Sequence, residues 1–223
     1  FKQKTACEIY QCDWSSDVCS TDLKPYTDRP QRQEGRSELK LATPVTTFSE
    51  RMTYRYKDLV VEAIYNGPAH TYGDVMVYLP QHKILFAADI AFFYVSPAGQ
   101  NGHITKWIEA IDRIMKMDVE RIVPGHGPIG TKKELAETRA YLDVLRTEVT
   151  KRFRLGMGIG EAAADLNTSG ALGRFANWTN QERNVSNTLR IYAELSGTIT
   201  PEIDQAGTDK AMAEYNAILA KKR

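Results

Sequence analysis

The sequence predicts an α/β protein in which strands come first and helices follow. Two observations support this prediction. Between residues 52 and 89, apolar residues alternate with polar ones or form short β-branched runs bounded by turn residues, which is typical of strands. From Ile104 onward apolar residues recur at helical spacing, and the short apolar run RIVP at 121–124 follows the first helical stretch. This order indicates a β-α-β element from Ile84 to Val123.

Four strands are predicted before the first helix. MTYRYK at 52–57 alternates apolar and polar residues, so we expect a half-buried strand there. LVVEAIY, DVMVYLP and KILFAAD are rich in β-branched and large apolar residues and predict three more strands. Asn66-Gly67 and Pro80-Gln81 mark the turns between them.

Capping signals place two of the later helices. Thr131 with Glu134 is a capping-box pattern, which predicts the start of a long helix. Thr179 with Glu182 repeats that pattern, so a further helix is expected to begin there, with Gly197 as its C-cap.

Several other features are better explained by structure than by function. GMGIG at 156–160 is glycine-rich, but it lies between helices rather than after a strand, so a turn is predicted instead of a phosphate loop. His103 is expected to start the first helix, and Trp107 is expected in the core. His82 is expected on the surface at a hairpin tip.

Composition limits the possible partners. The 29 Lys and Arg residues balance 28 Asp and Glu residues among 223, which gives no footprint for nucleic acid and no attraction to an anionic membrane. No apolar run reaches the ~20 residues of a spanning helix. We therefore expect a soluble globular protein; a small-molecule substrate is expected only from a resemblance that is described below. A cytoplasmic location is favoured, although the compartment and the oligomeric state are left open.

All three cysteines lie near the N-terminus, at Cys7, Cys12 and Cys19. Only one pair fits the close spacing of structural zinc sites, and no histidine precedes His70. An odd number of cysteines also suits a disulfide framework poorly. A zinc or disulfide module is therefore disfavoured.

The same segment resembles the in-frame translation of a sequencing-library adapter. KQKTACEI and DWSSDVCSTDL differ from adapter-derived KQKTAYEI and DWSSDVCSSDL only at Cys7 and Thr21. We expect residues 1–23 to be a non-native, adapter-like segment, 24–150 to be an incomplete domain whose fold is identified below, and 151–223 to be a helical C-terminal extension.

Three short segments carry the chemistry: GPAHTYGD at 67–74, LFAADI at 85–90 and VPGHGP at 123–128. They place His70, Asp89 and His126 in loops expected just past strands, where a sheet fixes functional groups. Imidazole and carboxylate ligands suit zinc, iron or manganese. Taken singly, each has a plainer interpretation, since a lone histidine is more often hydrogen-bonded structure and an Asp after a strand is often a cap.

In combination, AHTYGD, FAAD and VPGHG resemble the second half of the metallo-β-lactamase fold, from about Thr43 to Leu145. The resemblance implies half of an αββα sandwich followed by a helical extension. It also implies that His70 binds a first metal, that His126 binds a second and that Asp89 bridges both. Zinc is favoured, as one or two ions, with iron or manganese as alternatives.

The resemblance also implies that Thr71 and Asp74 fix the loop that orients His70. This sequence departs from the family's pattern at two points. Ala88 replaces the glycine usual before the bridging Asp, which is tolerable if its φ is negative. The family's His-x-His-x-Asp-His motif, which supplies the remaining ligands and the acid/base carboxylate, does not occur in this sequence.

The function implied by the resemblance is hydrolysis of an ester, thioester, lactone or related substrate by metal-activated water, as in glyoxalase II and other bacterial-type metallo-hydrolases. A β-lactamase proper is disfavoured, because many carry a thiolate at the position of Asp89. Without the first motif, we expect this chain to be an N-terminally truncated and inactive fragment whose catalytic residues are unknown. The alternative is a non-catalytic metal-binding or interaction module whose cysteines supply the missing ligands.

Overall fold

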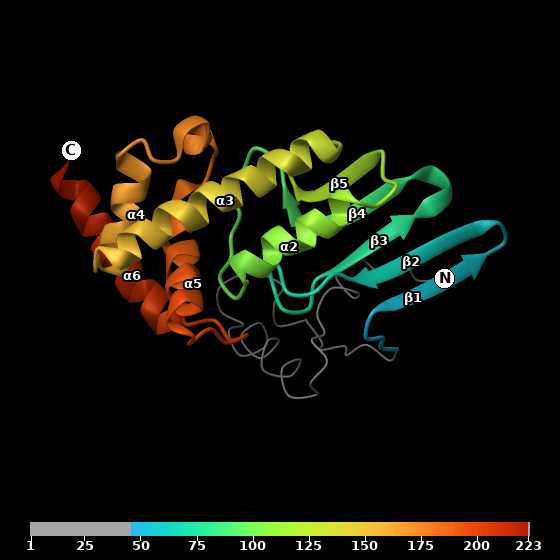
Figure 1. Ribbon diagram of the computed structural model, residues 1–223, viewed down its shortest axis with the longest axis horizontal. Helices are drawn as coiled ribbons and strands as arrows, with labels where there is room; N and C mark the ends of the chain where they lie inside the picture. The colour runs from blue at the N-terminus through green and yellow to red at the C-terminus, as the bar shows by residue number, and fades with distance from the viewer. Residues whose placement is uncertain (1–45, 223) are drawn as a thin grey trace, which may run out of the picture.

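The computed structural model describes residues 46–222 (Figure 1). The expected adapter-like segment lies outside the described residues. The strands are β1 (Arg51–Tyr56), β2 (Leu59–Tyr65), β3 (Val75–Leu79), β4 (Ile84–Phe92) and β5 (Arg121–His126). The α-helices are α2 (Ile104–Met115), α3 (Lys132–Arg154), α4 (Ile159–Thr168), α5 (Asn184–Ser196) and α6 (Gln205–Lys221). Short 3₁₀ turns are η4 (Pro80–His82), η5 (Gly173–Asn177) and η6 (Gln181–Arg183).

The strands form one sheet in the order β1-β2-β3-β4-β5. Pairing is antiparallel from β1 to β4, whereas β5 lies parallel to β4 with α2 as the crossover helix. The predicted β-α-β element and the turn at η4 are therefore confirmed.

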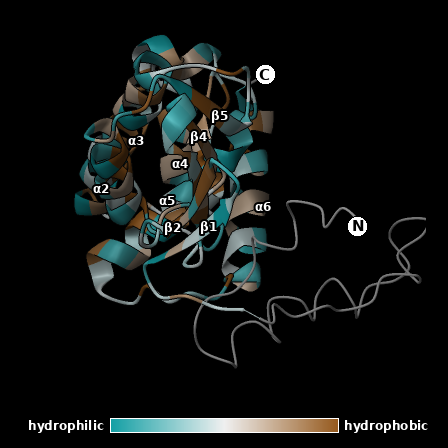
Figure 2. Cartoon of the chain, turned by 90° about the vertical axis from the view of Figure 1, so that its right-hand side faces the viewer, coloured by the Kyte–Doolittle hydropathy of each residue, from teal (hydrophilic) through white to brown (hydrophobic). Residues whose placement is uncertain are grey.

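One face of the sheet is covered by α2 and α3 (Figure 1). Met76, Leu85 and Ile122 point from the strands into a core that they share with Trp107 and Leu142 of these helices. In Figure 2 much of β4 and β5 carries apolar colours. The expectation that Trp107 lies in the core is confirmed, since it has no exposed surface.

The opposite face of the sheet is apolar across all five strands. The register places Tyr54 opposite Val61, and it places Val77 opposite Phe86 on that same face. Tyr54 and Phe86 remain 51% and 41% exposed. An apolar face of this extent is typical of a sheet that packs against a second layer. Whether this sheet is half of a sandwich stays a prediction.

The expected half-burial of β1 is wrong. The strand forms, but five of its six residues are exposed, including Tyr56 at 71%. The reason is its position at the sheet edge, with its tyrosines on the face that α2 and α3 do not cover.

The later helices α4, α5 and α6 pack around a smaller core of small residues and Tyr215. Gly160 lets α4 approach α6 closely, because a Cβ there would lie 2.5 Å from the Ala211 carbonyl oxygen. Residues 156–158 of GMGIG lie in the turn between α3 and α4, and Ile159 and Gly160 begin α4, so the predicted interhelical turn is confirmed. The predicted boundary at residue 150 falls within the last turns of α3, so whether 151–223 is a separate unit stays a prediction. Within residues 46–222, no helix combines the length and apolarity that crossing a membrane requires.

Two capping predictions are confirmed and one is wrong. Thr131 and Glu134 form the capping box of α3, and Gly197 ends α5 in a left-handed conformation. Thr179, however, does not cap α5, which begins at Asn184 without a side-chain cap. The carbonyl of Thr179 instead accepts a hydrogen bond from the Ser96 N–H, so tertiary pairing uses this residue before the helix starts.

Candidate metal centre

The structure brings His70, Asp89 and His126 together at one end of the sheet. Nδ1 of His70 lies 3.9 Å from Oδ2 of Asp89, and Nε2 of His126 lies 3.5 Å from Oδ1 of the same carboxylate. Each carboxylate oxygen therefore faces a different imidazole. His70 lies in the β2–β3 loop, as expected. Asp89 lies inside β4 and His126 is the last residue of β5, so their expected placement in loops is wrong.

A break in the pairing of β4 with β5 explains how Asp89 can lie within a strand and still present its carboxylate at the site. The register shifts between Phe86 and Ala88, and again before Phe92. Gly125 of β5 lies beside this break, where a Cβ would stand 2.0 Å from Oδ1 of Asp89. The absence of a side chain at Gly125 thus leaves the space that the carboxylate occupies.

Aromatic packing fixes both imidazole rings. Phe92 stacks on His126 with ring centroids 4.6 Å apart and planes inclined by 21°. Trp107 meets His70 edge-on at 5.6 Å. The indole N–H of Trp107 donates to the Ile90 carbonyl at 2.9 Å, which ties this ring to the strand that carries Asp89.

The His70 loop is closed by Thr71 and Asp74. The Thr71 N–H donates to Asp74 Oδ2 at 3.0 Å, and its hydroxyl donates to Oδ1 at 2.7 Å. Burial raises the pKa of Asp74, while the charge of His70 and the bonds from Thr71 partly oppose that rise. The two residues therefore lie where the resemblance expects loop-fixing groups. Their effect on His70 stays a prediction.

Ala88 does not have the negative φ that the sequence expectation required. Its φ is +48°, in the left-handed region that glycine adopts readily. The irregular register beside Asp89 imposes this conformation. It costs alanine ~1–2 kcal/mol.

We expect Ala88→Gly to stabilise the fold by ~0.5–1 kcal/mol, because the relief of strain exceeds the extra chain entropy that glycine loses on folding. Urea unfolding curves measure this difference. Ala91→Gly is the matched control: Ala91 is buried in the same strand with no positive φ, so that change should destabilise. If both changes lower the midpoint equally, Ala88 is not strained.

Helix α5 also reaches this end of the molecule, which sequence reasoning missed. Buried Arg190 donates from Nε to the Gly102 carbonyl at 2.8 Å, and it hydrogen-bonds the Tyr72 side chain beside His70. Asn187 accepts from the Gly99 N–H at 2.8 Å. The signal in the sequence was a polar stripe at helical spacing, Asn184, Asn187 and Arg190, opposite the apolar positions of that helix.

The residues fit metal ligation in part. Imidazole and carboxylate are ligands of divalent zinc, iron and manganese. In the part of the chain that the structure describes, no group of three or more His, Cys, Asp or Glu is placed to hold a single ion. Whether His70, Asp89 and His126 bind metal stays a prediction, and each ion would need ligands beyond this set. His82 is exposed at η4, and His103 caps α2, as predicted.

Part of the chain is similar to known proteins. Residues 58–126 match the family model "Metallo-beta-lactamase superfamily". A metallo-β-lactamase type 2 from Bacillus cereus is 29% identical over 108 residues, which is 46% of this chain and 41% of that protein. The alpha subunit of a 2,4-dinitroanisole O-demethylase from Nocardioides sp. is 30% identical over 96 residues, or 40% of this chain and 28% of that protein. The chain thus matches about two fifths or less of the length of these relatives.

Among solved structures, a stereoselective inverting sec-alkylsulfatase from Pseudomonas sp. shares the fold, with a TM-score of 0.53 and 18% identity over 69% of this chain and 26% of that one. The mixed α/β fold class expected from the sequence is confirmed. The segment that carries His70, Asp89 and His126 is similar to members of the metallo-β-lactamase superfamily.

Proposed function

We propose that this chain is part of a metal-dependent hydrolase in which Asp89 is shared by two divalent ions, with zinc favoured, His70 on one side and His126 on the other. The observation that supports the proposal is the carboxylate whose two oxygens face different imidazoles, at 3.9 and 3.5 Å. When bound, the ions would supply Lewis-acid chemistry to a water molecule and to the substrate oxygen.

The residues of this chain have separate roles in the proposal. Asp89 sets the distance between the two halves of the site, and Gly125 leaves the space that its carboxylate needs. Phe92 and Trp107 hold the two imidazole rings in place so that their nitrogens remain directed at Asp89.

The ligand set in this chain limits how tightly metal can bind. Catalytic zinc normally has three protein ligands and a water. Here each ion would have one imidazole and a share of Asp89, and the sequence contains no His-x-His-x-Asp-His motif. We therefore propose that these 223 residues alone bind metal weakly and hydrolyse little or no substrate.

Cobalt(II) titration of the purified chain, followed by calorimetry and visible absorption, tests the metal site. We expect weak binding that Asp89→Asn abolishes, because both ions lose their shared ligand. His70→Ala and His126→Ala should each remove only one of two binding events. His82→Ala is the matched control, since this exposed histidine lies at η4.

Unchanged cobalt binding in Asp89→Asn would rule out the proposed site. Tight, stoichiometric zinc together with measurable esterase activity would overturn the proposed weakness of the isolated chain.

The substrate class is proposed only broadly: an ester, thioester, lactone or related compound. The similar proteins carry names that refer to a β-lactamase, an O-demethylase and an alkylsulfatase, so they do not select one substrate. A hydrolysis panel should therefore include a β-lactam and a sulfate ester beside the three favoured classes.

A further inference from the structure

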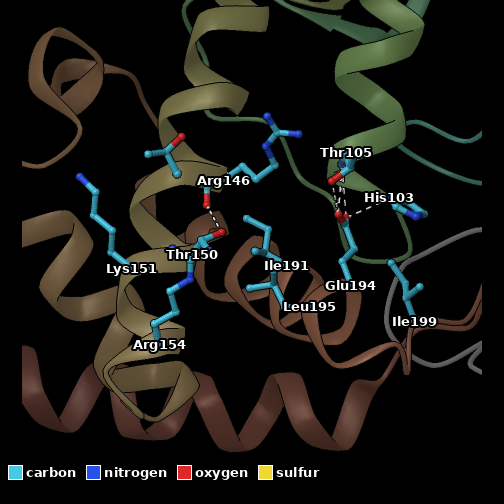
Figure 3. Close-up of a pocket in the computed structure, with 11 residues that line it drawn as sticks. His103, Thr105, Arg146, Thr150, Lys151, Arg154, Ile191, Glu194, Leu195 and Ile199 are labelled. Atoms are coloured by element: carbon cyan, nitrogen blue, oxygen red, sulfur yellow. Dashed lines mark hydrogen bonds and ion pairs between the residues drawn. The ribbon is translucent and has the colours of Figure 1, made fainter.

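A cavity of about 630 Å³ lies between the N-terminus of α2, the C-terminal half of α3 and helix α5 (Figure 3). Its size is within the ~300–1,000 Å³ range of small-molecule sites. None of its lining residues is His70, Asp89 or His126. The cavity is thus separate from the candidate metal centre.

One wall of the cavity is basic. Arg146, Lys151 and Arg154 line it from α3. Arg146 lies 3.0 Å from Asp143 and Lys151 lies 2.5 Å from Glu148, whereas Arg154 makes no ion pair within residues 46–222. In Figure 3 Arg146 extends from α3 toward Thr105, while Lys151 points away from the centre of the cavity. Among the three cations, Arg146 thus reaches across the cavity, and Arg154 lines it without a carboxylate partner in the described residues.

The opposite wall is apolar. Ile191 and Leu195 of α5 line it together with Ile199, and Leu195 remains 43% exposed. If an apolar ligand group covers the exposed surface of Leu195, binding becomes more favourable by ~25 cal/mol for each Å² of apolar surface removed from water.

The single carboxylate of the cavity is already bonded. Glu194 accepts from the Thr105 hydroxyl and the Ile104 N–H, each at 2.5 Å, and it lies 3.1 Å from Nδ1 of His103. Burial by itself would raise the pKa of Glu194, but the bonds from His103 and Thr105 hold that pKa below its ordinary value. Glu194 is thus hydrogen-bonded to residues at the start of α2 and does not pair with the cations of α3. The α3 wall of the cavity therefore keeps an excess of positive charge.

We propose that this cavity binds an amphipathic anion, with an oxyanion head at Arg146 and Arg154 and a short alkyl or aryl tail on Leu195 and Ile199. Carboxylate, sulfate and phosphate heads share the chemistry that guanidinium groups recognise. The proposal does not depend on the metal centre or on the proposed hydrolysis.

Calorimetric titration of the full chain with four probes, all below the micellar concentration, tests the proposal. Octanoate and octyl sulfate carry both a head and a tail, sodium sulfate carries only the head, and 1-octanol carries only the tail. We expect saturable one-to-one binding of the two amphiphiles and much weaker binding of sulfate and octanol. Equal affinity for octanol and octanoate, or for sulfate and octyl sulfate, would overturn the proposal.

Variants locate the binding. Arg154→Gln and Arg146→Gln should each weaken octyl sulfate binding about tenfold, as expected when one charge-assisted hydrogen bond is lost. Leu195→Ser should weaken the two amphiphiles without changing the affinity for sulfate. Thermal unfolding of each variant shows that the fold persists.

Two controls exclude other surfaces. Lys116→Gln removes an exposed cation that does not line the cavity, so binding should not change. Replacing both Tyr54 and Tyr56 with serine alters the exposed sheet face and should also leave binding unchanged. If the tyrosine variant loses binding while Arg154→Gln keeps it, the amphiphile occupies the sheet face and the cavity proposal is wrong.

Discussion

Replacing Gly125 with alanine is expected to displace the Asp89 carboxylate and abolish metal binding. The added Cβ would stand 2.0 Å from Oδ1 of Asp89 and 2.9 Å from the backbone carbonyl carbon of Ala88. The carboxylate can rotate away, but the backbone contact also forces β4 and β5 apart. We expect a loss of ~1–3 kcal/mol in the free energy of unfolding, typical of overpacking, together with loss of cobalt binding.

Gly156→Ala is the matched control, because a Cβ at Gly156 meets nothing within 4 Å. Its φ of +73° should cost ~1 kcal/mol of stability, yet cobalt binding should remain. A Gly125→Ala protein that binds cobalt like the parent chain would show that the close approach of β5 to Asp89 is not needed for the site.

Trp107→Ala is expected to cause the largest loss of stability. Trp107 is fully buried and packs against the rings of Phe92 and His70 at 5.9 and 5.6 Å. Truncating a buried aromatic residue typically costs ~3–5 kcal/mol. The change also leaves the Ile90 carbonyl without its indole donor. Since natural domains are stable by only ~5–15 kcal/mol, chemical denaturation should reveal a severe loss or a failure to fold.

Trp107→Phe keeps a ring but removes the N–H donor, so its effect should be intermediate, and NMR of the His70 ring should report the altered contact. Tyr56→Ala provides the control, because this 71% exposed residue should change stability by less than ~0.5 kcal/mol. A Trp107→Ala protein as stable as Tyr56→Ala would contradict the role of Trp107 in the core.

The parts of the fold that could be predicted were those with local signals. The apolar spacing of α2 and the Thr131–Glu134 capping box each depend on residues close in sequence, and both are confirmed. The Thr179–Glu182 pattern looked the same but failed, because Thr179 pairs with Ser96 from a distant loop. Local patterns predict helix ends only where no tertiary contact competes for the same groups.

The candidate site shows the same limit. Glycine and turn residues around His70 and His126 made those positions recognisable in the sequence. The positive φ of Ala88 and the space left by Gly125 both depend on how β4 and β5 meet. Neither feature could be predicted from the residue alone. The contact of Arg190 with the His70 loop likewise joins segments far apart in sequence.

Anomalous diffraction from crystals of the chain soaked in millimolar cobalt(II) tests the central claim most directly. We expect two anomalous peaks, one beside His70 and one beside His126, with Asp89 between them. A single peak contacted by both imidazoles, or no peak next to Asp89 at full cobalt saturation, would contradict the shared carboxylate and the proposed function built on it.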